Sequence, residues 1–246
     1  MGNIEHIKPY QSSQDSKKNQ VQKMFDKIAP AYDSLNSILS LGIDNYWRRK
    51  AIQLIPISDA QLEILDVACG TGDMSILASK RFPHYQFTGI DLSEGMLEVG
   101  KKRILKINAD QIKLQWGDCE NLPYEPNTFD AIMVAFGVRN FENLELGIQN
   151  MYRVLKENGK IIILEFSKPR VFPFKQIYTA YFRYVLPWIG RIGSKDDKAY
   201  KYLYDSVQQF PDYERFVGIL EKSGFHHCNY KPLSLGICSI YTGIKS

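Results

Sequence analysis

The stretch Asp66-Val67-Ala68-Cys69-Gly70-Thr71-Gly72-Asp73 decides the fold of this 246-residue chain. A mainly apolar run over 62–65 precedes it, and apolar residues at helical spacing follow it over 74–78. This order predicts a strand, a glycine turn and the start of a helix. The two glycines permit a sharp turn and a close approach of the backbone to a ligand, at which the helix directs its free N–H groups.

A second feature, Asp91, lies nineteen residues after Gly72, at the end of an apolar strand expected over 87–90. A carboxylate at this place can accept hydrogen bonds from both hydroxyl groups of a ribose. The two segments together therefore predict a nucleoside-binding βαβ unit.

The charges around the turn indicate which nucleoside it binds. A dinucleotide-binding turn has a third glycine where this chain has Ser75, and it avoids acids such as Asp66 and Asp73 beside a pyrophosphate. Two carboxylates suit a ligand that carries an ammonium and a sulfonium group. S-adenosylmethionine is such a ligand, so we predict it as the cofactor, with Asp66, Gly70 and Gly72 in its site. A glycine turn alone is also compatible with a purely structural role.

The composition sets outer limits on the function. The apolar content of 44% and the length fit one substantial core, and the net charge of +4 alone is too mild to indicate nucleic acid. No run reaches the ~18 apolar residues of a membrane span, and residues 1–20 lack the apolar stretch of a signal peptide. We therefore expect a cytoplasmic protein. The four cysteines show no paired spacing, so neither a metal nor a disulfide is expected.

The remaining chain alternates strands and helices. Further strands are expected over 111–115, 129–135 and 160–165, each separated from the next by a helix or a loop. This alternation predicts a doubly wound parallel sheet with helices on both faces. Two last strands, over 225–231 and 236–244, are close enough in sequence to pair as an antiparallel hairpin at one edge. The prediction is thus a seven-stranded, mostly parallel α/β sheet.

Two segments stand outside this alternation. Residues 1–18 are expected to form a flexible tail ahead of one domain over 19–246, whose first part, 19–58, is helical. A helix from Val21 is ended by Pro30, and Asp44 is expected to cap a second one. This part is either a simple cover of the sheet or a lid over the ligand turn that carries Tyr32 to its edge.

The second segment is an aromatic, basic insert over 168–210. It contains 11 of the 31 aromatic residues. Residues 168–201 include eight Lys or Arg and two Asp, which gives a local charge of +6. A helix that ends at Pro187 is expected in the insert. One face of this helix would carry Phe174, Ile177, Tyr181 and Tyr184. The face is either part of the core or a peripheral membrane contact.

Residues just past each strand end are the candidates for chemistry, because ligands of open α/β sheets bind there. Asp118 and Cys119 follow the third strand, where they suit the amino group and ring nitrogen of adenine; a solvated loop acid is the alternative for Asp118. The fourth strand is followed by Arg139 and Asn140, where a substrate would face the methyl donor.

Several longer stretches resemble the ubiquinone/menaquinone biosynthesis C-methyltransferase family, from about residue 20 to the C-terminus. They are 25–33 (FDKIAPAYD), the glycine turn, 137–140 (GVRN), 151–156 (MYRVLK) and 164–169 (LEFSKP). The resemblance implies a Rossmann-like class I S-adenosylmethionine-dependent methyltransferase fold. Its donor-binding positions fall on Thr71, Asp91, Asp118 and Cys119. Some members have a donor-contacting Ser where this chain has Ala135, so that contact is not carried over.

The resemblance also implies a prenylated quinol as substrate. A quinol ring carbon becomes nucleophilic when a neighbouring hydroxyl, with a pKa of roughly 10, loses its proton. Arg139 is suited to stabilise the resulting phenolate, while Asn140, a water and Tyr32 are expected to orient the ring or relay the proton. No histidine or metal is expected to take part.

The predicted function is methylation of demethylmenaquinol to menaquinol. Methylation of the prenylated methoxy-benzoquinol precursor of ubiquinone, or of both, is the alternative among enzymes, and a prenylquinone-binding carrier is the non-enzymatic one. A nucleic-acid methyltransferase is less well supported, because no Asn-Pro-Pro-Tyr-type motif occurs. The length of the substrate's prenyl tail, the proton acceptor and the oligomeric state stay open, with a homodimer among the alternatives.

Overall fold

The computed structural model describes residues 4–11, 13–32, 42–180 and 197–246. The strands are β1 Glu63–Val67, β2 Gln86–Asp91, β3 Ile112–Trp116, β4 Phe129–Ala135, β5 Leu155–Phe166, β6 His226–Leu233 and β7 Cys238–Ile244. The α-helices are α1 Lys17–Ile28, α3 Ile43–Ile52, α4 Asp73–Arg81, α5 Glu94–Lys106, α6 Leu144–Val154, α7 Phe174–Ala180, α9 Asp197–Gln209 and α10 Glu214–Lys222.

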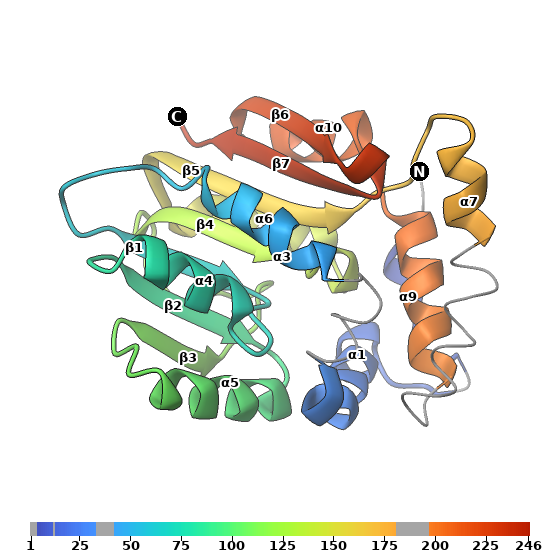
Figure 1. Ribbon diagram of the computed structural model, residues 1–246, viewed down its shortest axis with the longest axis horizontal. Coiled ribbons are helices and arrows are strands. Elements are labelled where there is room, and N and C mark those ends of the chain that lie inside the picture. Colours follow the sequence, from blue (N-terminus) through green and yellow to red (C-terminus); the bar gives the residue numbers. More distant parts are fainter. Residues whose placement is uncertain (1–3, 12, 33–41, 181–196) are drawn as a thin grey trace.

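The strands form one seven-stranded sheet in the order β3-β2-β1-β4-β5-β7-β6. The first five are parallel, whereas β7 pairs antiparallel with both β5 and β6 (Figure 1). Strand order reverses between β1 and β4, and ligands of doubly wound sheets bind beside such a reversal. The predicted fold class, including the antiparallel edge, is therefore confirmed.

Helices cover both faces of the sheet, because its central strands are apolar on both sides. On one face, alternate residues such as Ile64 and Met133 pack against α3, α4 and α5. On the other face, their neighbours Leu65 and Ile132 pack against α6 and α10. In Figure 1 the first group of helices lies in front of the sheet and α6 and α10 lie behind it.

The N-terminal segment differs from the expected flexible tail. Ile4 and Lys17 are buried, and the Lys17 Nζ donates hydrogen bonds to the carbonyl oxygens of Ile4 (3.0 Å), Arg139 (3.2 Å) and Phe141 (2.7 Å). A buried ammonium is tolerated when such acceptors surround it. The segment is therefore packed against the loop that follows β4, which its polar composition did not indicate.

Two helix starts also differ from the sequence prediction. α1 begins at Lys17 and not at Val21, because the Ser16 side chain accepts a hydrogen bond from the Asn19 N–H and caps the helix earlier. At α3 the residue before the helix is Gly42, and Asp44 lies inside the first turn. Asp44 is buried there, with its carboxylate 3.6 Å from the Arg48 guanidinium.

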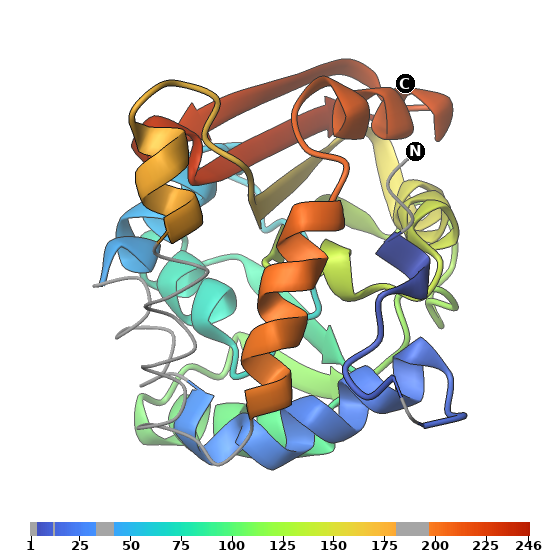
Figure 2. The same cartoon turned by 90° about the vertical axis from the view of Figure 1, so that its right-hand side faces the viewer.

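The helices α1 and α9 lie beside the edge of the sheet at which the parallel strands end (Figures 1 and 2). α7 and α9 both belong to the aromatic insert over 168–210. In α7, Tyr178 is buried and Phe174 is exposed. Of the predicted helical face, Phe174 and Ile177 lie in α7. Tyr181 and Tyr184 lie outside the described residues, as does Pro187.

Candidate active site

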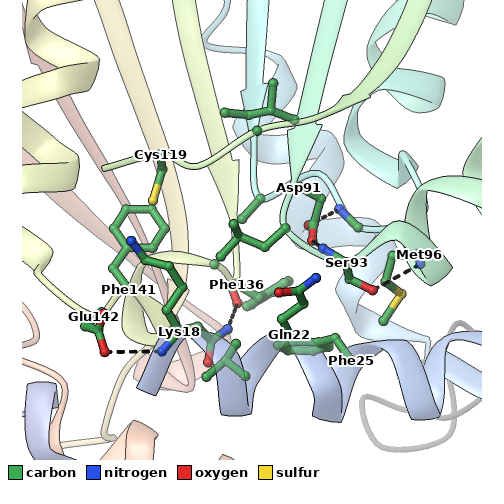
Figure 3. A pocket seen from close by; sticks show the side chains of 18 of the residues that line it. Lys18, Gln22, Phe25, Asp91, Ser93, Met96, Cys119, Phe136, Phe141 and Glu142 are labelled. Carbon is green, nitrogen blue, oxygen red and sulfur yellow. Dashed lines mark hydrogen bonds between the residues drawn. The ribbon is translucent and has the colours of Figure 1, made fainter. Parts of the chain in front are cut away.

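A pocket opens where β1, β2 and β4 end, and α1 forms one of its walls (Figure 3). Its lining includes Gly70 and Asp91 from the sheet side and Phe25 and Tyr32 from the N-terminal helices. Phe25 and Tyr32 contact each other edge to face, with ring centroids 5.8 Å apart. The pocket thus combines a polar floor with apolar walls, which suits a ligand with a sugar and an aromatic base.

The glycine turn has the backbone that its sequence predicts. Gly70 and Gly72 have φ values of +54° and +79°, a region that side chains with a Cβ rarely adopt. Gly70 lines the pocket, and Gly72 directly precedes α4. The turn therefore brings bare backbone to the pocket wall.

Asp91 ends β2 and faces the pocket with both carboxylate oxygens already oriented. Oδ2 accepts a hydrogen bond from the Gly70 N–H and Oδ1 accepts one from the Ser93 N–H, each at 2.8 Å. Burial raises the pKa of Asp91, and these backbone N–H groups act in the opposite direction. Each oxygen retains a lone pair for a second donor, as binding of a ribose diol requires.

The other residues predicted at this turn lie behind it. Thr71 is buried and its hydroxyl accepts a hydrogen bond from Arg103 (2.9 Å). Asp73 forms ion pairs with the same Arg103 at 2.7 Å and with Arg48 at 3.6 Å. The charge of Asp73 is therefore offset by two arginines, so it contributes little to attracting a cationic ligand.

Asp66 keeps an unused acceptor. Its Oδ2 accepts hydrogen bonds from the Ser75 hydroxyl (2.7 Å) and the Ser75 N–H (3.2 Å). Its Oδ1 is buried and has no hydrogen-bond partner among the described residues. Burial raises the pKa of Asp66 to about 7, although Ser75 and the nearby Arg48 lower it. A cationic ligand group or a water would satisfy this oxygen.

The two adenine-binding residues predicted after β3, Asp118 and Cys119, lie in different environments. Cys119 lines the pocket, whereas the Asp118 carboxylate forms an ion pair with Lys18 of α1 at 2.6 Å. Lys18 also pairs with Glu120 at 3.1 Å, and both Lys18 and Glu120 line the pocket. Although burial lowers the pKa of Lys18, these two acids raise it overall. Sequence reasoning missed Lys18 and Glu120, since nothing local marks them.

The end of β4 presents Arg139 and Asn140 in different directions. Phe136 adopts a φ of +59°, and its carbonyl oxygen accepts hydrogen bonds from the Arg139 guanidinium and from the Asn140 Nδ2 (3.4 Å). Asn140 lines the pocket, but Arg139 is 5% exposed and turned towards β5. The left-handed backbone conformation of Phe136 thus directs its carbonyl oxygen towards both side chains.

Arg139 forms a buried ion pair with Glu165, at the end of β5, with 2.8 Å between Nη1 and Oε1. Glu165 is fully buried, and the Phe166 N–H also donates to it at 2.9 Å. Burial raises the pKa of Glu165, and Arg139 lowers it. The sequence prediction assigned Arg139 to the phenolate and named no acid as its partner. The only signal for its partner was an acid at the end of an otherwise apolar strand.

The geometry fits an adenosine derivative with a cationic tail better than it fits a metal. The described residues hold no group of three metal-ligating side chains. A ribose can bind Asp91, and an aromatic base can lie among Phe25, Met96 and Cys119. Asp66 is 1% exposed and does not line the pocket, so only a ligand group that passes beyond the lining residues would reach its Oδ1. Beyond that ligand, Asn140 lines the place where a second substrate would meet it, whereas Arg139 and Glu165 are buried and do not line the pocket.

Comparison with known proteins places this architecture in one family. Residues 13–245 match the model of the ubiE/COQ5 methyltransferase family. A protein of Bacteroides fragilis named demethylmenaquinone methyltransferase is 46% identical over 242 residues, which are 98% of each chain. A protein of Geotalea daltonii named ubiquinone/menaquinone biosynthesis C-methyltransferase UbiE is 45% identical over 231 residues, 93% of this chain and 97% of that one.

Solved structures with low sequence identity share the fold. Phosphoethanolamine N-methyltransferase 2 of Haemonchus contortus, in complex with S-adenosyl-L-methionine, gives a TM-score of 0.69 at 16% identity, over 96% of this chain and 61% of that one. A SAM-dependent methyltransferase of Thermotoga maritima gives a TM-score of 0.65 at 17% identity, over 92% of this chain and 99% of that one. At these identities the likeness shows that the architecture is shared.

Proposed function

The chain belongs to the ubiE/COQ5 methyltransferase family, and on that premise we propose that it methylates a ring carbon of demethylmenaquinol, with S-adenosylmethionine as methyl donor. The observation that carries the choice of substrate is the 46% identity, over 98% of both chains, to a relative named demethylmenaquinone methyltransferase. The protein acts in the cytoplasm, at the inner face of the membrane that holds the quinol.

A second candidate substrate has its own support. A relative named for both ubiquinone and menaquinone biosynthesis is 45% identical to this chain. Purified protein should be given S-adenosylmethionine and, in separate reactions, a short-tailed demethylmenaquinol or a methoxy-benzoquinol, with products identified by mass spectrometry. A mass increase of one methyl group in the first reaction alone supports menaquinol formation. Methylation of both compounds would extend this substrate assignment, and methylation of the benzoquinol alone would replace it. If neither compound is methylated, a prenylquinone-binding carrier is favoured.

The donor would lie along the ends of β1, β2 and β3. Asp91 offers both oxygens to the ribose hydroxyls, and Phe25 and Met96 offer apolar surface to the adenine ring. The unpaired Oδ1 of Asp66 is suited to the ammonium of the methionine end. S-adenosylmethionine supplies an electrophilic methyl group on a sulfonium, so the protein has to supply position and a deprotonated quinol.

The protein's contribution to chemistry lies at the β4 end. A phenolate oxygen beside the reacting carbon is stabilised by the positive field of Arg139 and by a donor from Asn140. Holding the ring in line with the methyl group can itself contribute ~7–11 kcal/mol to lowering the barrier. Because Glu165 offsets part of the Arg139 charge, the field at the ring is that of an oriented ion pair.

The pKa of Asp66 predicts a pH dependence of donor binding. Because the folded-state pKa is raised to about 7, the carboxyl is mostly protonated below that pH, and an adjacent cation favours its charged form. The affinity for S-adenosylhomocysteine should therefore increase as pH rises from about 5.5 to about 7.5, with release of a proton on binding. Calorimetry in buffers of different ionisation enthalpy measures both effects.

The matched control for this pH dependence is Asp66→Asn. Its amide can still accept the hydrogen bonds from Ser75, but it does not titrate. We expect this variant to bind with an affinity that is nearly constant over the same pH range. An equal slope in both proteins would assign the titration to another group.

The aromatic insert is proposed to contact the surface of the membrane. No helix in the described part of the chain is long and apolar enough to span a bilayer. Val171 and Phe172 are 63% and 76% exposed, next to the exposed Phe174 and Lys175. Exposed aromatic and basic side chains together are typical of surfaces that bind anionic bilayers, where each basic residue contributes about 1 kcal/mol.

We predict that changing Val171, Phe172 and Phe174 to serine weakens sedimentation with vesicles that contain anionic lipids. Changing Ile57 and Leu105 to serine is the matched control, because these residues are as exposed but lie elsewhere, at 79% and 75%. Binding should also fall when Lys175 is changed to glutamine together with Arg183 and Arg191, two residues outside the described ranges. Activity on a short-tailed quinol should persist in all of these proteins. Equal vesicle binding by all would refute the membrane contact.

A further inference from the structure

The amide of Asn140 has a defined orientation, because both of its ends have partners. Its Nδ2 donates to the Phe136 carbonyl oxygen at 3.4 Å. Its Oδ1 accepts a hydrogen bond from the Tyr202 hydroxyl at 3.1 Å. Since Tyr202 holds the oxygen from outside the pocket, the donor that this amide has left for a ligand is the second N–H of Nδ2.

Tyr202 is placed to impose this orientation. It lies on α9, which passes in front of the strand ends (Figure 2), and it is 3% exposed. Its ring packs with Val21 and Met24 of α1, so the hydroxyl cannot move freely. Burial raises the pKa of the Tyr202 hydroxyl, which therefore stays protonated and acts as a donor.

We propose that Tyr202 is a positioning residue, which holds the Asn140 amide so that its N–H faces the pocket and donates to an oxygen on the substrate ring. The inference rests on the proposed function and adds the substrate group that the site recognises. This group is an acceptor oxygen, hydroxyl or phenolate, beside the carbon that receives the methyl group. It also assigns the insert a part in catalysis, through α9.

The opposite orientation of the amide would work against the reaction. Without the Tyr202 hydroxyl, Asn140 can rotate by half a turn and present its carbonyl oxygen to the ring. An amide oxygen facing a developing phenolate is repulsive, and the donor that stabilised it is lost. The effect should appear in the methyl-transfer step and hardly at all in donor binding.

The direct test is Tyr202→Phe, which removes one oxygen and keeps the packing of the ring. We expect kcat/KM for a short-tailed quinol to fall about 10- to 100-fold, the size of one hydrogen bond to a charged group. The Kd of S-adenosylhomocysteine should stay within about twofold, and the melting temperature should change little. The matched control is Tyr152→Phe on α6, because the Tyr152 hydroxyl donates to the Ser246 carbonyl oxygen (3.4 Å) and Tyr152 does not line the pocket.

A double-mutant cycle separates positioning from general support of the fold. If Tyr202 acts through Asn140, Tyr202→Phe should cause no further loss in an Asn140→Ala background. Asn140→Asp should lose activity as Asn140→Ala does, because it keeps an acceptor for Tyr202 and has no N–H to donate. An equal loss from Tyr202→Phe in both backgrounds would overturn the inference, as would a wild-type rate in the single variant. Absence of methylation by the unaltered protein would instead refute the proposed function.

Discussion

Replacing Asp91 by alanine should raise the Kd of S-adenosylhomocysteine by more than about a hundredfold. Two ribose hydroxyls lose a charged acceptor, and hydrogen bonds to charged groups contribute about 1.5–3 kcal/mol each. The carboxylate lines the pocket and is already fixed by two backbone N–H groups at 2.8 Å. Titration calorimetry measures the change. An unaltered affinity would remove Asp91 from the donor site.

The same substitution also releases the N–H groups of Gly70 and Ser93, so the ribose contact needs its own control. The ligand 5′-methylthioadenosine and its 2′-deoxy analogue differ by one ribose hydroxyl. The unaltered protein should prefer the first, and the Asp91→Ala protein should bind both equally weakly. If the variant keeps the preference, the loss comes from a collapsed turn and the hydroxyls are recognised elsewhere.

Local sequence patterns were sufficient for the sheet and for the pocket floor. Gly70, Gly72 and Asp91 were predictable because a strand, a tight turn and a strand end each have a short-range signature. Alternation of elements and the handedness of their connections predicted a doubly wound parallel sheet, but not the order of its strands. These features depend on neighbours within about 20 residues, which a single sequence displays.

The ion pairs of the site were not predictable in this way. Lys18 pairs with Asp118 across 100 residues, and Lys17 reaches the Arg139 carbonyl across 122. No periodicity links such partners, and a polar N-terminal segment is typical of disorder as well. Asp73 illustrates the consequence. The sequence suggested a free acid beside the ligand, whereas Arg48 and Arg103 offset its charge.

Glu165 is an intermediate case. Once β4 and β5 are known to be parallel neighbours, with Ala135 opposite Leu164, the residues after both strands must lie close together. The ion pair between Arg139 and Glu165 then follows from register. A single sequence does not supply this register, so Glu165 was not expected as the partner of Arg139.

Replacing Arg139 by leucine should lower the single-turnover rate of methyl transfer by about 10- to 100-fold, because the phenolate loses the field of the oriented Arg139–Glu165 ion pair, which contributes less than a direct oxyanion donor. Donor affinity should hardly change, because Arg139 does not line the pocket. Arg139→Lys should recover only part of the rate, since a lysine lacks the planar guanidinium whose Nη1 donates to both Glu165 and the Phe136 carbonyl.

The Arg139→Leu variant also leaves Glu165 buried without its cation. Removal of one partner of a buried ion pair costs about 3–5 kcal/mol of folding free energy. The pKa of Glu165, already raised by burial, should rise further. Because this folded-state pKa lies above the unfolded one, the variant should be most stable at low pH and lose stability as pH rises through the folded pKa.

The double variant Arg139→Leu/Glu165→Leu separates catalysis from stability. Two apolar side chains can fill the buried site without an unpaired charge, so the melting temperature should recover while the methyl-transfer rate stays low. That result would assign the rate loss to the missing guanidinium rather than to a damaged fold. A double variant that transfers methyl groups at nearly the wild-type rate would make the ion pair structural. The phenolate would then depend on Asn140 and on groups outside this pair.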